Sequence, residues 1–212
     1  MHPVLLVAAC FLPPLAWAVR SLRTGLLPLR SVLGSVPLSL AAVLAASLSQ
    51  ILLDPVSLVL SGAPGILFSG FIVAALVEEL ARLAAVALLS GSRPAPSRSL
   101  FAGALLVGLF FSAFENLAYA LPDPSILWLR TLTSLPVHAA ASLLGAAFLS
   151  GAGCALRAGP GPLPLLIAVV LHGTFSSGMD AGGAGISVAL LAALVLGILA
   201  RDAWTRAPQE EA

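Results

Sequence analysis

The sequence has little charge, few cysteines and no lysine. Only 9% of its 212 residues are charged, whereas a soluble domain carries about 25%, and 59% are hydrophobic. This balance excludes a soluble globular protein and indicates an integral membrane protein. Two cysteines in apolar surroundings, Cys10 and Cys154, are too few for a disulfide framework or a thiolate metal site. All ten basic residues are arginines, the net charge is +1, and no nucleic-acid partner is expected.

Seven apolar segments, separated by short linkers rich in Pro, Gly, Ser or Arg, predict the fold. They cover residues 3–19, 31–53, 66–90, 100–121, 131–156, 163–179 and 184–200. We therefore predict an all-α membrane protein, a bundle of about seven transmembrane helices that forms a single domain over residues 1–212. No arginine precedes the first segment, so we expect it to remain as a helix and not to be removed as a signal peptide.

The arginines predict the orientation in the membrane. Eight of them fall on one side of a seven-helix topology, namely Arg20, Arg23, Arg30, Arg93, Arg98, Arg157, Arg201 and Arg206. The opposite side carries Asp54, Asp123 and Asp180, with Arg130 at a helix edge. By the positive-inside rule the N-terminus lies outside and the C-terminus in the cytoplasm of a multi-pass protein of the cell (plasma) membrane. Arg130 and Asp180 are then expected at the outer interface.

Residues 77–82, VEELAR, place three charges near the middle of the third apolar segment. An ionised side chain at that depth costs roughly 2.5–3.5 kcal/mol, so Glu78, Glu79 and Arg82 require partners. The following segments hold the other polar groups: Glu115, Asn116 and Tyr119, then His138, then His172 and Ser176. Ionisable residues inside a membrane are candidates for function by default.

Depth and helical spacing indicate that these groups can meet. At ~1.5 Å rise per residue, Glu78 lies roughly 18 Å from the outer end of its segment. Glu115, His138 and His172 lie roughly 9–11 Å from the outer ends of theirs. Arg82 shares a helical stripe with Glu78, whereas Glu79 is turned ~100° away and is expected to face a different neighbour. Such a layer of carboxylates and imidazoles is suited to general acid–base work on water.

The order EELAR, FSAFENLAY, LPVHAAASLLGA, LHGTFSSGMD resembles the PrsW family of intramembrane proteases, which is related to the CAAX prenyl endopeptidases and the bacteriocin-processing superfamily. The resemblance covers about 105 residues, from Glu78 to Asp180. It implies an endopeptidase that cuts a membrane-protein substrate, with site-1 cleavage of an anti-sigma factor as the associated reaction. The superfamily was first described as metal-dependent and later as glutamic, with Glu and His activating water and no bound zinc.

Carried onto this chain, the resemblance implies that Glu78, Glu79, His138 and His172 are the catalytic residues. Glu78 would be the general base, His138 would position the attacking water, and His172 would stabilise the oxyanion or protonate the leaving amine. The supporting residues would be Arg82, Glu115, Asn116, Tyr119 and Ser176. Ser176 stands where related proteases often carry Asn, and Arg82 stands where Lys is common in the family.

Other mechanisms and functions stay open at the level of sequence. We favour no metal cofactor, but Glu78, His138 and His172 would make a His₂Glu zinc set, although no HExxH motif is present. The same polar layer could serve as a proton relay in a proton-coupled transporter. A membrane scaffold or immunity-type protein with a decayed site is a third alternative.

Overall fold

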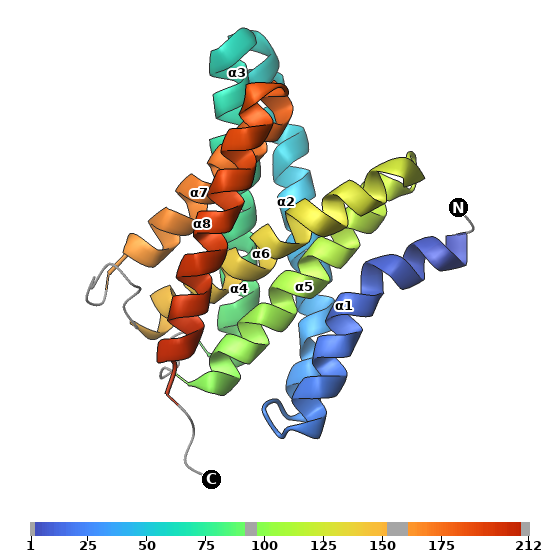
Figure 1. Ribbon diagram of the computed structural model, residues 1–212, viewed down its shortest axis with the longest axis vertical. Coiled ribbons are helices and arrows are strands. Elements are labelled where there is room, and N and C mark those ends of the chain that lie inside the picture. The colour runs from blue at the N-terminus through green and yellow to red at the C-terminus, as the bar shows by residue number, and fades with distance from the viewer. Residues whose placement is uncertain (1–2, 92–96, 152–160, 209–212) are drawn as a thin grey trace.

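Figure 1 shows the computed structural model, which describes residues 3–91, 97–151 and 161–208. Its elements are α1 (Pro3–Arg23), α2 (Leu29–Leu60), α3 (Gly62–Phe68), the π-helix η1 (Ser69–Leu76), α4 (Val77–Ser90), α5 (Arg98–Ala120), the 3₁₀-helix η2 (Pro124–Ile126), α6 (Leu127–Ser150), α7 (Leu163–Ala181) and α8 (Ala184–Arg206). Arg93, Cys154, Arg157 and the end of the predicted segment 131–156 lie outside the described residues.

The predicted all-α polytopic fold is confirmed. Within the described residues, α1, α2, α5, α6 with η2, α7 and α8 are long and apolar enough to cross a membrane. The predicted segment 66–90 corresponds to a seventh rod, in which α3, η1 and α4 follow one another without a break. The direction of the termini across the membrane remains a prediction.

Two local features differ from the predicted pattern. A linker was expected at 54–65, but α2 continues through Asp54 and Pro55 to Leu60. Both of these residues are exposed, so the backbone hydrogen bond that Pro55 cannot make is missing at the surface of the bundle and not in its core. At 1.5 Å per residue, α2 is about 48 Å long and exceeds the hydrocarbon core of ~30 Å. The second feature is η1, which ends at Leu76, two residues before Glu78, and which the apolar pattern does not predict.

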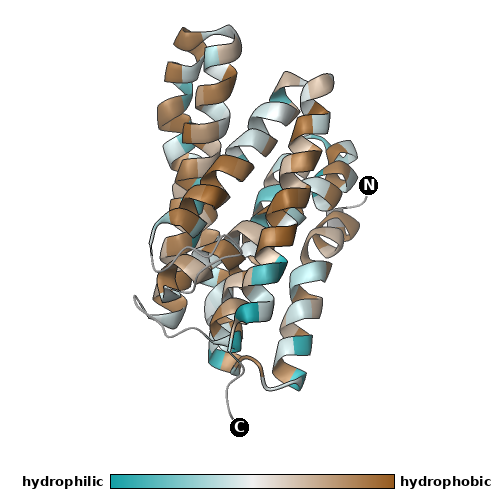
Figure 2. Ribbon diagram, turned by 60° about the vertical axis from the view of Figure 1, so that its left-hand side comes forward, coloured by the Kyte–Doolittle hydropathy of each residue, from teal (hydrophilic) through white to brown (hydrophobic). Residues whose placement is uncertain are grey.

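Helix α5 lies at the centre of the bundle and contacts α1, α2, α4 and α6. Its Phe101, Leu106 and Phe111 are almost completely buried, whereas Leu58 and Val59 of α2 are 79% and 85% exposed. Burial of the first group and exposure of the second suit a bundle whose outer surface faces lipid. Figure 2 shows hydrophobic residues along the helix shafts, with hydrophilic residues gathered at the end where the C-terminus lies.

Two glycines let the helices that carry the polar residues approach closely. A Cβ added to Gly108 of α5 would lie 2.7 Å from the carbonyl oxygen of His138 on α6. A Cβ added to Gly70 of η1 would lie 2.8 Å from the backbone nitrogen of Ser177 on α7. Both distances are shorter than van der Waals contact, so only glycine allows these helix approaches. They bring the two histidine-bearing helices against the two glutamate-bearing rods.

Candidate active site

The first turns of α4 bury a charged triplet. Glu78, Glu79 and Arg82 are each 3% exposed or less. The Arg82 guanidinium donates through Nη2 to Glu79 Oε1, and Nη1 lies 3.5 Å from Glu78 Oε2. Its carbon also stacks 4.6 Å above the ring centroid of Phe111. Since Arg82 follows the two glutamates by three and four residues, one guanidinium serves both carboxylates.

His172 on α7 contacts both glutamates of this triplet. Its Nδ1 lies 2.8 Å from Glu79 Oε1, and its Nε2 lies 3.7 Å from Glu78 Oε2. An ionised carboxylate only accepts hydrogen bonds, so Nδ1 carries a hydrogen and donates to Glu79. Nε2 is thereby directed at Glu78. The expectation that Glu79 faces a different neighbour from Glu78 was wrong, because His172 and Arg82 each reach both side chains.

His138 on α6 is held between a carboxylate and a guanidinium. Its Nε2 lies 2.8 Å from Glu115 Oε2 on α5, and Arg82 Nη1 donates to its Nδ1. Arginine has no acceptor atom, so Nδ1 must accept and Nε2 must donate to Glu115. The same Nδ1 lies 3.7 Å from Glu78 Oε2. The two imidazole rings meet edge to face, with centroids 5.2 Å apart.

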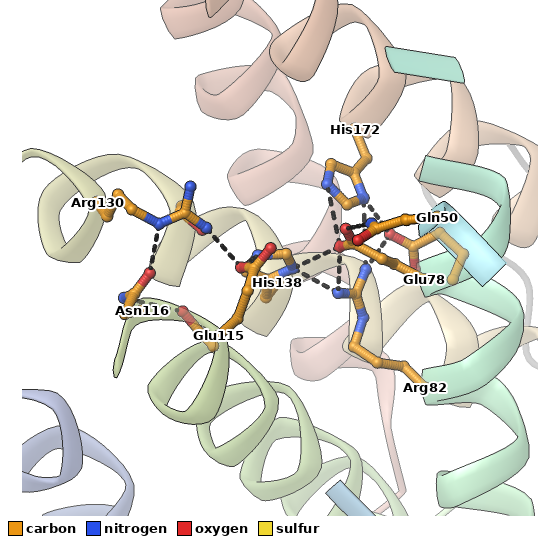
Figure 3. A network of polar contacts seen from close by, with 11 residues as sticks. Gln50, Glu78, Arg82, Glu115, Asn116, Arg130, His138 and His172 are labelled. Carbon is orange, nitrogen blue, oxygen red and sulfur yellow. Dashed lines mark hydrogen bonds and ion pairs between the residues drawn. The ribbon is translucent and has the colours of Figure 1, made fainter. Parts of the chain in front are cut away.

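Glu78 stands at the centre of this network (Figure 3). Its Oε1 accepts a hydrogen bond of 2.8 Å from Gln50 Nε2 on α2. Its Oε2 is buried and, among the described residues, has no hydrogen-bond partner. Gln50 was missed by the sequence reasoning, because it precedes Asp54 by four residues and resembles a polar residue at a helix end. The available signal was an amide inside the apolar segment 31–53.

Arg130 takes part in the network, which the sequence reasoning did not predict, and its expected position at the outer interface stays a prediction. Its Nη2 lies 2.7 Å from Glu115 Oε2, and its Nε donates to Asn116 Oδ1 at 3.0 Å. Its guanidinium also stacks 3.8 Å from the centroid of the Tyr119 ring. Because α6 begins at Leu127, Arg130 lies in its first turn and reaches back across to α5. Asn116 and Tyr119 therefore contact the network through Arg130.

The network forms one wall of a cavity of about 490 Å³. The cavity is lined by residues of seven elements, including Gln50, Asp54, Glu78, Glu115, Tyr119, Arg130, His138, His172, Ser176 and Asp180. The structure thus brings Glu78, His138 and His172 together, with Glu79 and Arg82 directly behind them. Ser176 lines the same cavity, one helical turn beyond His172. A cavity of this volume and lining has room for water beside the buried cluster.

The same donors fit a metal ion. Glu78, His138 and His172 each offer one ligand atom, and these atoms lie within 4.8 Å of one another. Each histidine also holds a carboxylate with its other nitrogen, as metal-binding histidines commonly do. Two histidines and a glutamate with an open fourth position are a known catalytic zinc set. To bind here, an ion would have to displace Arg82 Nη1 from His138 Nδ1.

Comparison with known proteins supports the resemblance on which the sequence analysis depends. The family model described as PrsW family intramembrane metalloprotease matches residues 25–200. The match includes every residue of the network and all the helices that carry them. Searches of curated proteins and of solved structures returned no match. The metalloprotease description gives no support to the expectation that a metal is absent. The chain therefore belongs to the PrsW family, a family of intramembrane proteases embedded in the membrane by several helices.

Proposed function

We propose that this chain is an endopeptidase that hydrolyses a peptide bond of a membrane-protein substrate, with Glu78 and His172 activating the attacking water. The observation that carries the proposal is the position of Glu78 Oε2. It is buried without a hydrogen-bond partner among the described residues, and one nitrogen of each histidine lies 3.7 Å away. That separation leaves a place where one small polar molecule can touch all three groups.

Charge balance determines how many protons the cluster carries. Three carboxylates, Glu78, Glu79 and Glu115, face two guanidiniums, Arg82 and Arg130. Guanidinium stays charged in proteins, so fully ionised carboxylates would leave one net negative charge inside the membrane. One additional proton makes the cluster neutral, which a medium of low dielectric favours. Glu78 Oε2 and His172 Nε2 lie 3.7 Å apart, so in this proposal the proton passes between them through a water molecule.

The reactive form has Glu78 ionised and His172 protonated, with its Nδ1–H held by Glu79. Glu78 Oε2 takes one proton from water while the water oxygen bonds to the carbonyl carbon of the substrate. His172 Nε2–H then gives its proton to the amide nitrogen, and the carbon–nitrogen bond breaks to leave a carboxylic acid and an amine. Return of the proton from Glu78 to His172 restores the starting form.

The remaining residues hold these two groups in place. Arg82 offsets the charge of both glutamates and fixes the His138 ring from one side, while Glu115 fixes it from the other. Arg130 in turn anchors Glu115. His138 Nδ1 therefore keeps a constant position beside the reaction centre. Groups that are fixed in this way do not have to reorganise during the reaction.

A metal-assisted form of the same hydrolysis is the second candidate, favoured by the donor set and by the family description. Glu78, His138 and His172 would hold the ion, which would supply a polarised carbonyl and a more acidic bound water. Metal analysis of the purified protein, with cleavage measured in chelator, separates the two forms. Stoichiometric zinc whose removal abolishes cleavage would contradict the metal-free form.

The substrate class in this proposal is a membrane protein, and an anti-sigma factor is the first one to test. The support for that substrate is the family resemblance, which is an analogy and not a property of the site.

The test is fragment mapping of membrane proteins in cells that express either the wild type or Glu78→Gln. Peptide fragments that require Glu78 are the expected result. Asp202→Asn is the matched control, because Asp202 only makes a surface ion pair with Arg206. If the two fragment sets are identical and proteoliposomes instead show substrate-dependent proton flux, the transporter alternative replaces the protease.

A further inference from the structure

A second cavity of about 250 Å³ lies beside the active-site cavity and is mostly apolar. It is lined by Val43, Ala46, Ser47, Gln50, Glu78, Phe111, Glu115, Ala118, Tyr119 and Pro122. Four of these residues, namely Gln50, Glu78, Glu115 and Tyr119, also line the active-site cavity. The two cavities therefore meet at the proposed general base.

Two facing helix stripes form the walls of this groove. Val43, Ala46, Ser47 and Gln50 of α2 recur at i, i+3, i+4 and i+7, so they lie on one side of that helix. The opposite wall is formed in the same manner by Phe111, Glu115, Ala118 and Tyr119 of α5. We call this space between α2 and α5 the side groove.

The side groove is closed at one end and open at the other. At the closed end the helices touch, and Ser39 Oγ of α2 donates to the Val107 carbonyl of α5 at 3.1 Å. Figure 1 shows the two helices diverging toward their C-terminal ends. There Ser47 and Ala118 are exposed, whereas Val43, Ala46 and Phe111 on the floor are buried. The open end thus faces the surroundings of the bundle, and the floor leads to Glu78.

We propose that the side groove binds an aliphatic side chain of the substrate, belonging to a residue that flanks the scissile bond, and that the substrate segment enters between α2 and α5. This inference depends on the proposed protease function. Continuity with the active-site cavity supports it, because a side chain in the groove holds its own main chain against Glu78. On the floor, Val43, Ala46 and Phe111 offer no hydrogen bond, so a polar or charged group that rests on them would lose its hydration without compensation.

Small residues limit what the groove accepts. Ala46 on the floor and Ala118 at the open end both line it, so a larger side chain at either position fills space that a leucine of the substrate would occupy. In a hydrophobic enzyme pocket, one methylene changes kcat/KM by about 10- to 200-fold. We therefore expect the wild type to prefer leucine over glycine at the groove-bound position by at least about tenfold.

The first experiment uses a substrate whose fragments depend on Glu78, with each residue beside the cut replaced in turn by Gly, Ala, Leu and Trp. Ala118→Phe is expected to lose cleavage of the leucine form by about tenfold or more while retaining the alanine form. Ala45→Phe is the matched control, because Ala45 is exposed and does not line the groove. If the two variants affect every substrate form equally, the proposal is wrong. Lipid, and not the substrate, then occupies the groove.

A second measurement does not depend on a bulky residue being tolerated. In the Glu78→Gln protein, Ser47→Cys is expected to form a disulfide with a substrate that carries cysteine at the groove-bound position, and Ala45→Cys is not. Cross-linking from both positions alike, or from neither, contradicts lateral binding in the groove. If the wild type releases no fragment that requires Glu78, the proposed protease function fails first, which is distinguishable from either result.

Discussion

Gln50 provides the sharpest test of how Glu78 is held. Its Nε2 donates the one hydrogen bond that Glu78 receives from α2, at 2.8 Å. Replacement by methionine keeps the length of the side chain and removes the donor, so Glu78 Oε1 loses its partner in a buried site. A hydrogen bond to a charged group contributes about 1.5–3 kcal/mol. Since about 1.4 kcal/mol corresponds to a tenfold change in rate, we expect cleavage to fall about 10- to 150-fold.

The loss should appear mainly in kcat, because Gln50 bonds the general base, whereas methionine keeps the length of the side chain that lines the side groove. The assay is cleavage of a Glu78-dependent substrate in membranes, with melting in detergent measured on the same preparation. Ser49→Ala is the control, since the Ser49 hydroxyl only donates to the Ala45 carbonyl of its own helix. Wild-type kcat in Gln50→Met, or a loss that merely follows a lower melting temperature, would refute the reasoning.

Three further predictions concern the network around Glu78. Glu79→Gln should lower the melting temperature more than Glu78→Gln, because breaking a buried pair costs about 3–5 kcal/mol and Glu79 is bonded to Arg82; equal melting of the two variants would contradict this assignment. Arg82→Gln should bind zinc at least about tenfold more tightly than the wild type in a competition with a chromophoric chelator, because it removes a cation from His138 Nδ1, and unchanged affinity would mean that the guanidinium does not compete. Gly108→Ala should reduce cleavage and destabilise the protein by about 1–3 kcal/mol, because the added Cβ meets the His138 carbonyl; wild-type cleavage would show that the α5–α6 approach is not needed.

Most of the fold could be predicted because its physical cause is local. A run of apolar residues long enough to cross the bilayer must be helical, since no water is present to bond its backbone. The seven segments therefore correspond to seven helical rods. The ends were less predictable: α2 passes through Pro55, which lies on the exposed surface of the bundle, where the missing backbone hydrogen bond is not buried in the core. The π-helical η1 depends on how its rod packs against α7, which an apolar pattern does not encode.

The sequence predicted which residues belong to the candidate site better than it predicted the contacts among them. Glu78, Glu115, His138 and His172 stand out because an ionisable residue in an apolar helix is costly without partners. The helical stripe correctly joined Arg82 to Glu78, but it separated Glu79 from them, although His172 contacts both glutamates. A helical wheel describes one helix, whereas that contact depends on how α7 approaches α4.

By itself, the sequence determined that this protein is an all-α, multi-pass membrane protein and which polar residues need partners, because these follow from composition and from the cost of burying charge. Only the tertiary structure decided which nitrogen of each histidine points at Glu78, that Gln50 and Arg130 complete the network, and that α2 and α5 leave a groove beside it. Those outcomes depend on distances of a few ångströms between residues far apart in the chain. Close approaches at Gly70 and Gly108 set such distances, and they exist only once the helices are packed.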